Sequence, residues 1–557
     1  MNKDSLSRRG FVKTGTGILA SMAAASGANA TSHMTDYDTT NANKSRRAAQ
    51  ALDLKINAAW DHYQTSLSLH QQDSYDDIHR YDSNGFYSSF SKTLPCNRFG
   101  EVATTPFNRL RQALKTGRKV DFDRVKLAPS ARRHLANPQG AFRFEVSGLD
   151  GHSTRIAPSW NLRSPEAAGE VIEVYWQALA RDIPFADYEQ DDLIGAAIED
   201  LSDCFQIPGY KINGPLRAGN IFRGETTGDL VGPYLSQFLW QDFDFGPSRM
   251  VQQYETGKAN LNFMTDPDHW VHIQRGGIPR ENMSFAENRR YIFDGRSLGE
   301  YVHRDVAYQA YLNAAMILLS HGNEAIDDGN PYRKWHHNQG AFTSFGTPFI
   351  MDMVSRAANL ALSGAWFQKW RMHLHLRPEA FGGRIHFHQM GQRYYEIHRD
   401  ILNSRVMNRV FSQYGSFLLP QAYSEGSPTH PSYPAGHGAV AGSCVTVLKA
   451  CFKEDFVLPE PVIASVDGST LEPYQGDDLT VGNELNKLAN NIAIGRNFAG
   501  VHYRQDGVQG LFCGEQQAIS LLKDQSRTLH EAGFEGFNLT TFHGEEINIK
   551  NGIVSRV

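Results

Sequence analysis

Three short blocks rich in cationic residues and histidine lie far apart in the last third of this 557-residue chain. They occupy residues 369–378, 430–437 and 496–506. Each block alone is a weak signal, but three in this order indicate that distant segments meet at one site. The fold must therefore bring all three blocks together, and no other feature of the sequence constrains it as strongly.

The residue types in these blocks fit a pocket for a small tetrahedral oxyanion. Such an anion needs converging donors, and the guanidinium groups of Arg377 and Arg496 and the ammonium group of Lys369 supply them with charge assistance. Gly436 precedes a mostly apolar run that predicts a helix, so its N–H is expected at the positive end of that helix. One histidine in each of the last two blocks can donate, accept or bond covalently to the central atom.

The three blocks resemble the pattern shared by vanadium-dependent haloperoxidases and type 2 acid phosphatases: Lys-x7-Arg-Pro, Pro-Ser-Gly-His and Arg-x5-His-x3-Asp. The long region before the first block favours the haloperoxidases, because the phosphatases are mostly short. Residues 232–239, 290–298 and 419–428 also resemble the algal-type vanadium bromoperoxidases. The likeness covers most of the chain after its first few dozen residues.

The resemblance implies an all-α fold of two four-helix bundles, with additional helices and a few short β-hairpins. The blocks would converge in the core of one bundle. It also implies vanadate, V(V), as the cofactor, which acts as a Lewis acid without changing oxidation state. Hydrogen peroxide would oxidise bromide or iodide to a hypohalous species that halogenates an organic acceptor. Members of this family often form homo-oligomers, so a homo-oligomer is expected.

The resemblance also implies a role for each residue of the pocket. His502 would bind the metal through one ring nitrogen, while His437 would hydrogen-bond the apical oxygen and move a proton when hydrogen peroxide displaces it. Lys369 would polarise the bound peroxide, and Asp506 would orient a neighbouring cation. The groups expected to hold the equatorial oxygens are Lys369, Arg377, Arg496 and the Gly436 amide.

Two positions bear on the halide. His430 lies seven residues before His437, where bromoperoxidases carry histidine and the fungal chloroperoxidases carry phenylalanine. Trp366, three residues before Lys369, matches an aromatic residue on the halide side of the family's pocket, although an aromatic at helical spacing is more often plain core. The resemblance therefore favours bromide or iodide over chloride.

The chain departs from the family pattern at Ala435, where both families usually carry a serine that donates to an equatorial oxygen. Losing one hydrogen bond to a charged group costs about 1.5–3 kcal/mol, or roughly tenfold to a hundredfold in anion affinity. The remaining cations argue against an inactive site, so weak retention of the cofactor is the expectation.

Two alternatives stay open at this point. In an exported acid phosphatase, His502 would be phosphorylated and His437 would protonate the leaving group. In a non-catalytic oxyanion-binding protein, the substitution at Ala435 would have removed turnover. Phosphatase activity without vanadate would favour the first alternative, and tight anion binding without turnover would favour the second. His430 and the long region before Lys369 favour the haloperoxidase.

Apolar residues at helical spacing predict a mainly helical chain, and strand signals are few. A Ser-Pro start signal at 164–165 begins one predicted helix, which should stop at Pro184. Strands are predicted at 142–146, 546–550 and 553–557, the last two around an Asn-Gly turn. Further helices are predicted around residues 52–63 and at 301–319, 354–370, 438–452 and 509–529.

The first thirty residues resemble a twin-arginine export signal. Arg8 and Arg9 precede a short apolar stretch and an Ala-Asn-Ala cleavage site at 28–30. That stretch is too short to span a bilayer, so no membrane span is expected in the mature chain, which would be periplasmic or extracellular. A polar linker at 31–44 would lead into a helical haloperoxidase domain at 45–557, with the vanadate pocket within 366–506.

Net charge and cysteine content bear on nucleic-acid binding, zinc sites and disulfides. A net charge of −5, without a basic tract that carries interleaved aromatics, gives no reason to expect nucleic acid. Five cysteines leave at least one unpaired in a monomer, and their spacing does not suggest zinc. Cys444 and Cys451 lie two turns apart on one predicted helix, about 10 Å along its axis, which is too far to form a disulfide.

Overall fold

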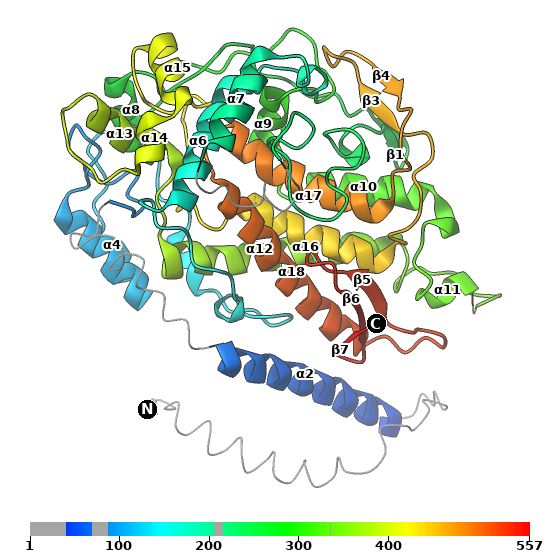
Figure 1. Cartoon of the computed structure of the whole chain (residues 1–557). Helices are drawn as coiled ribbons and strands as arrows, with labels where there is room; N and C mark the ends of the chain where they lie inside the picture. The colour runs from blue at the N-terminus through cyan, green and yellow to red at the C-terminus, as the bar shows by residue number, and fades with distance from the viewer. Residues whose placement is uncertain (1–40, 70–86, 205–214, 335) are drawn as a thin grey trace, which may run out of the picture. The chain divides into compact units, whose positions relative to one another are not determined.

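The structure, a computed structural model, describes residues 41–69, 87–204, 215–334 and 336–557. The predicted export signal and most of the predicted linker therefore lie outside the described residues. The chain divides into two compact units, Met1–Asn57 and Ala58–Val557. Of the first unit the structure describes only the beginning of helix α2 (Asn41–Leu69), which starts inside the predicted linker. All other described elements belong to the second unit (Figure 1).

The second unit is mainly helical, which confirms the expected fold class. Short 3₁₀ turns connect many of its helices, and one π-helical turn, η7 (Gln368–His373), follows α12 directly. The helices after α2 are α4 (Thr104–Thr116), α5 (Lys119–Phe122), α6 (Pro165–Ala180), α7 (Asp192–Ser202), α8 (Pro267–Gln274), α9 (Gly295–Arg304), α10 (Gln309–Ser320), α11 (Pro331–Lys334), α12 (Thr347–Phe367), α13 (Pro378–Gln389), α14 (Arg399–Asn403), α15 (Arg405–Tyr414), α16 (Gly436–Cys451), α17 (Val481–Phe498) and α18 (Arg504–Ser526).

The described strands are short and antiparallel. Two isolated hairpins pair β1 (Phe243–Phe245) with β2 (Ser248–Met250), and β3 (Val462–Ala464) with β4 (Leu471–Pro473). A three-stranded sheet near the C-terminus has the order β5-β6-β7. Its members are β5 (Phe537–Thr540), β6 (Glu546–Lys550) and β7 (Ile553–Arg556), so the predicted terminal pair is confirmed.

The core of the second unit is built around α16, which packs against α12, α17 and α18 (Figure 1). Every residue of α16 except His437 is buried, and most of them are small or apolar on all sides of the helix. Glycines let α16 and α18 approach closely. A Cβ atom at Gly442 would lie 2.1 Å from the Leu511 carbonyl oxygen, and one at Gly514 would lie 1.9 Å from the Ala439 carbonyl oxygen.

Two predicted elements were wrong or only partly right. The strand at 142–146 does not form, since the Arg143 N–H bonds to the Gly140 carbonyl in a local turn and the Phe144 side chain is 79% exposed. The single helix predicted at 301–319 is two helices. It breaks at Asp305, whose backbone is extended (φ −59°, ψ 146°), and it resumes at Gln309. This break places the Asp305 carboxylate beside the second motif block.

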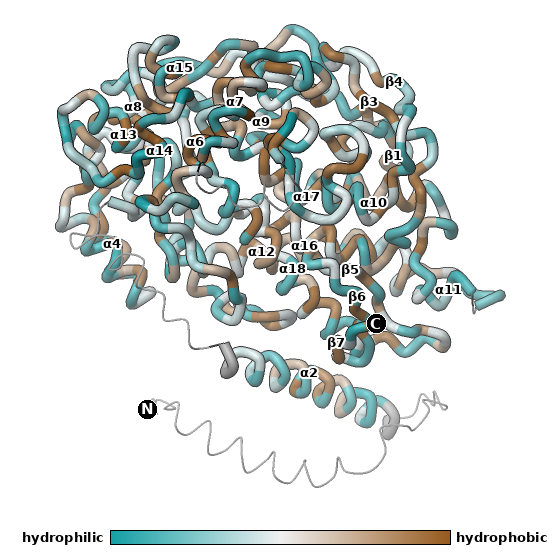
Figure 2. The backbone as a smooth tube through the Cα atoms, in the orientation of Figure 1, coloured by the Kyte–Doolittle hydropathy of each residue, from teal (hydrophilic) through white to brown (hydrophobic). Residues whose placement is uncertain are grey.

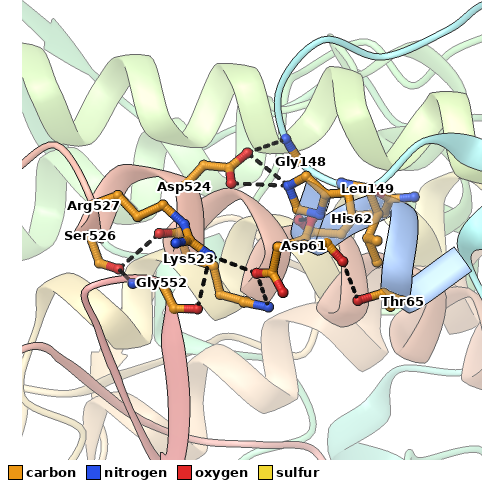
Figure 3. A network of polar contacts seen from close by, with 12 residues as sticks. Asp61, His62, Thr65, Gly148, Leu149, Lys523, Asp524, Ser526, Arg527 and Gly552 are labelled. Atoms are coloured by element: carbon orange, nitrogen blue, oxygen red, sulfur yellow. Dashed lines mark hydrogen bonds and ion pairs between the residues drawn. The ribbon is translucent and has the colours of Figure 1, made fainter. Parts of the chain in front are cut away.

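The end of α2 that belongs to the second unit is held by polar contacts to α18 (Figure 3). Asp61 accepts from the Lys523 ammonium at 2.8 Å and from the Arg527 guanidinium at 2.7 Å. The His62 Nε2 atom lies 3.0 Å from the Asp524 carboxylate. Along α2, hydrophilic residues alternate with a few hydrophobic ones (Figure 2), so these charged contacts, rather than burial of a broad apolar face, fix this part of the helix.

Candidate active site

The three motif blocks meet where several helices begin or end. Trp366 lies at the end of α12, and Lys369 lies in the π-helical turn that follows. Arg377 is the residue before α13, and its neighbour Pro378 fills the first position of that helix, where a missing N–H costs nothing. The other predicted groups are His430 and Ala435 in the segment before α16, Gly436 and His437 in its first turn, Arg496 in the last turn of α17, His502 between α17 and α18, and Asp506 in the first turn of α18.

Arg377 joins the three blocks. Its Nη1 atom donates to the Nε2 atom of His502 at 2.9 Å and to the Val501 carbonyl at 2.8 Å. Its Nη2 atom lies 3.0 Å from the Nδ1 atom of His430, and its Nε atom donates to the His430 carbonyl at 3.0 Å. The guanidinium is fully buried, and its four hydrogen bonds reach groups from both later blocks at once.

His502 is held in one tautomer by Asp506. The Nδ1 atom of His502 lies 2.7 Å from the Asp506 carboxylate, which can only accept, so Nδ1 carries the proton. The lone pair is then on Nε2, the nitrogen that faces Arg377. Asp506 also accepts from the Ser432 hydroxyl and from the Tyr503 N–H. The sequence predicted that Asp506 orients a cation, whereas its carboxylate contacts the imidazole and these two neutral donors.

Lys369 and Arg496 complete the cationic set, and backbone carbonyls accept from both. The Lys369 ammonium donates to the carbonyls of Pro431 and Ser432 at 2.9 and 2.7 Å. Arg496 donates from Nη1 to the Val302 carbonyl at 2.6 Å, while its buried Nε has no hydrogen-bond partner among the described residues. Within the residues that the structure describes, none of these three cations forms an ion pair with Asp or Glu, and the Asp506 carboxylate bonds to His502 instead, so the site holds excess positive charge that an anion would balance.

The electrostatics of the site agree with this imbalance. Burial and repulsion from neighbouring cations lower the pKa of Arg377 to about 9 and hold the pKa of Lys369 well below its usual value. Burial, followed by repulsion from Arg377, also holds the pKa of His430 and of His502 well below the usual range, so both imidazoles are neutral. A bound oxyanion would reverse the repulsion and favour the charged forms of the cations.

His437 has a carboxylate partner that the motifs did not predict. Its Nε2 atom lies 3.0 Å from the Asp305 carboxylate, whose side chain is only 6% exposed, against 28% for His437. Asp305 lies where α9 ends, 132 positions away in sequence, and no motif marks it. The sequence did not reveal Asp305, because it predicts one continuous helix at 301–319. The break at Asp305 is what directs this residue to the site.

His430 and Trp366 lie side by side at the edge of the site. Their ring centroids are 4.9 Å apart at an interplanar angle of 43°. The indole N–H of Trp366 is buried and has no hydrogen-bond partner within the described ranges. The Nδ1 atom of His430 lies between a donor, the Arg377 Nη2 atom at 3.0 Å, and an acceptor, the Pro431 carbonyl at 3.2 Å. The indole N–H of Trp366 is therefore the donor that this pair offers to a small anion.

The start of α16 supplies the backbone donor that the sequence predicted. Gly436 is the first residue of the helix, so its N–H is one of the amides that have no partner within the helix. A Cβ atom there would lie 3.5 Å from the Trp366 ring, which places this amide on the side of the site where the indole lies. Ala435 precedes the helix, is fully buried and offers no side-chain cap.

This donor set fits a tetrahedral oxyanion such as vanadate, and several known proteins share the architecture. Residues 353–531 match the family model of the VCPO second helical-bundle domain. Vanadium-dependent bromoperoxidase from Ascophyllum nodosum is 34% identical over 487 residues, covering 83% of this chain and 86% of that protein. The Corallina pilulifera vanadium-dependent bromoperoxidase is 33% identical over 548 residues, covering 83% and 91%.

A solved structure agrees with these relatives. The homohexameric second vanadate-dependent bromoperoxidase of Ascophyllum nodosum superimposes with a TM-score of 0.86 at 28% identity, over 95% of this chain and 94% of that one. Among the described residues, no helix has the length and apolar character needed to cross a membrane. The shared identity, the matched helical bundle and the superposition agree: this chain belongs to the family of vanadium-dependent bromoperoxidases.

Proposed function

We propose that the protein binds vanadate and uses hydrogen peroxide to oxidise bromide or iodide to a hypohalous species that halogenates organic acceptors. The observation that carries this proposal is the set of three buried cations without a carboxylate partner in the described chain, gathered around the neutral imidazole of His502. Vanadate, when bound, would supply the Lewis acidity that activates hydrogen peroxide. A phosphate group would suit the same cations, so the assay must separate the two chemistries.

In this proposal, Lys369, Arg377, Arg496 and the Gly436 amide hold the oxyanion. Arg377 is already bonded to Nε2 of His502, so it must release that nitrogen before the imidazole can act as a ligand. Asp506 keeps the proton of His502 on Nδ1 and so leaves the lone pair on Nε2, the nitrogen proposed to bind the metal. Lys369, surrounded by carbonyls and other cations, would gain its proton fully once an anion is present.

His437 is the proposed proton carrier. It is the one residue of α16 that is not buried, so its ring can exchange protons with solvent. The Asp305 carboxylate at 3.0 Å orients the ring. A proton taken up at the other ring nitrogen could then be delivered to an oxygen at the site, as general acid–base catalysis requires.

Comparing bromination with ester hydrolysis tests the proposed function. The mature protein should brominate a phenol-type dye with hydrogen peroxide and bromide, and addition of orthovanadate should raise the rate from near zero. Hydrolysis of a phosphate ester, measured in parallel without vanadate, should stay at background. Ester hydrolysis without bromination would move the activity to an acid phosphatase, and anion binding without either reaction would leave a binding protein.

Trp366 is proposed to contact the halide, and the variant Trp366→Phe tests this role. The substitution keeps the ring but removes the buried N–H, so the KM for bromide should rise roughly tenfold while kcat and vanadate affinity change little. Trp370→Phe is the matched control, because its indole N–H is also buried and unpartnered among the described residues, but its ring packs edge-to-face against Phe90, whereas that of Trp366 lies beside His430. Equal KM values in both variants would rule out the role of Trp366.

The remaining proposals concern the whole protein. Residues 1–30 would direct export by the twin-arginine route, with a polar linker before the haloperoxidase domain at 45–557, and intact-mass analysis of the exported protein would locate the cleavage. The Ascophyllum nodosum structure is a homohexamer, which supports a homo-oligomer here, and light scattering of the purified protein would measure its size. A monomer in solution, or an uncleaved N-terminus after export, would contradict the corresponding proposal.

A further inference from the structure

A buried ion pair contacts the segment that carries His430. The Lys92 ammonium is 3.0 and 3.1 Å from the two carboxylate oxygens of Glu379, and the two residues are 4% and 1% exposed. Gln274 also donates to the Glu379 carboxylate. Glu379 lies in the first turn of α13, two residues after Arg377. The pair is therefore attached to the same helix start as the arginine that joins the three motif blocks.

The pair binds the backbone of residues 425–430, here called the His430 loop. Lys92 donates to the Ser427 carbonyl at 2.6 Å and to the Glu425 carbonyl at 3.2 Å. Glu379 accepts from the Ser427 N–H. The N–H and the carbonyl of Ser427 are thus both held by one ion pair, three residues before His430.

The sequence of the loop permits this close approach at one position. Gly426 has φ +63°, a conformation that favours glycine. A Cβ atom on this residue would lie 2.6 Å from an oxygen of Glu379. Any other residue would push the Glu379 carboxylate away from the loop, so the contact between the ion pair and the loop depends on this glycine.

The far end of the loop is held by Arg377. Its guanidinium bonds to both the ring and the carbonyl of His430 at 3.0 Å. Two residues at the start of α13 therefore bind the loop: Glu379 contacts Ser427, and Arg377 contacts His430. Since these two points are only three positions apart, a shift at Ser427 changes where the His430 ring lies against Trp366.

We propose that the Lys92–Glu379 pair is a positioning element that fixes His430 beside Trp366 and so sets the affinity for the halide. This inference rests on the proposed role of His430 and Trp366 in halide binding. A buried ion pair is a poor source of stability, because an apolar or neutral pair of similar shape is often equally stable. The three backbone hydrogen bonds that the pair makes to the loop give it a positioning role instead.

A set of three variants tests the proposal. Lys92→Met leaves a buried carboxylate and Glu379→Gln leaves a buried ammonium, so each single variant should lower the Tm and raise the KM for bromide about tenfold or more. The double variant, in which positions 92 and 379 are both neutral, should recover most of the Tm. Its KM for bromide should stay raised, because the charged bonds to Ser427 and Glu425 are still missing. The vanadate dissociation constant, measured by calorimetry, should change less than about threefold in the double variant.

A recovery of KM together with Tm in the double variant would overturn the proposal, since the pair would then act through stability alone. The matched control is the double neutralisation of Lys487 and Glu484, a fully buried pair at 2.6 Å on α17 that makes no contact with the His430 loop. That control should leave the KM for bromide unchanged.

Amide hydrogen exchange across the His430 loop gives a readout that does not depend on turnover. Exchange at residues 425–430 should speed up at least tenfold in the Lys92–Glu379 double variant and stay unchanged in the α17 control. A wild-type protein without bromination would defeat the proposed function, whereas an active wild type with unchanged loop exchange and unchanged KM in the variants would defeat this inference alone.

Discussion

Replacing His502 with alanine is expected to abolish vanadate-dependent bromination. The variant removes the imidazole nitrogen proposed to bind the metal but keeps Lys369, Arg377 and Arg496. Vanadate should then bind only as an electrostatically held anion, with affinity lowered by more than about a hundredfold, the loss seen even for residues that merely orient a metal ligand. Calorimetric titration with orthovanadate and bromination rates at saturating vanadate measure the two effects separately.

Two controls define this expectation. Asp506→Asn keeps the shape beside Nδ1 but removes the negative charge, so affinity should fall roughly tenfold to a hundredfold, less than in the alanine variant. His386→Gln changes another buried histidine, whose Nδ1 accepts only from the Phe417 N–H, and should leave vanadate affinity unchanged. If the alanine variant at 502 still binds vanadate within tenfold of the wild type, the imidazole is not the metal ligand.

The parts of the site that could be predicted are those that depend on residues close together in the sequence. Gly436 is expected at a helix start because an apolar run follows it, and α16 does begin there. The four-residue spacing between His502 and Asp506 places both side chains on one side of the turn that opens α18. Helix positions were predictable for similar reasons, since α6 follows the Ser-Pro start signal at 164–165 and α16 coincides with the apolar run, whereas α18, predicted from residue 509, begins five residues earlier at Arg504.

The parts that could not be predicted depend on contacts between distant residues. Asp305 reaches His437 only because a helix breaks at a position where apolar periodicity continues on both sides. Lys92 and Glu379 are 287 positions apart, and nothing around Lys92 distinguishes it from an exposed lysine. The alternating residues at 142–146 resembled a strand, yet no described strand pairs with them, and the side chains of Phe144 and Val146 face solvent. Local patterns report propensity, whereas tertiary pairing decides these positions.

Placing serine at position 435 is expected to tighten vanadate binding by roughly tenfold to a hundredfold, the worth of one hydrogen bond to a charged group. Ala435 is fully buried, and its backbone is extended (φ −67°, ψ 128°) immediately before α16. A hydroxyl added there would lie beside the Gly436 amide, at the end of the helix that favours negative charge. The dissociation constant for vanadate, from reconstitution of the metal-free protein, measures the gain.

The same hydroxyl has a competing use, since a serine before a helix often accepts from an N–H of the first turn and stabilises the helix by about 0.5–2 kcal/mol. The two outcomes differ in what they change. A serine that donates to the anion should raise the affinity for vanadate and also for inorganic phosphate, with little change in Tm of the metal-free protein. A serine that only caps α16 should raise that Tm and leave both affinities where they are, and Ala435 would then have no part in retaining the cofactor. Because the Gly436 amide already lies at the helix start and the oxyanion would compete for the same amides, we expect the hydroxyl to turn to the anion whenever vanadate is present.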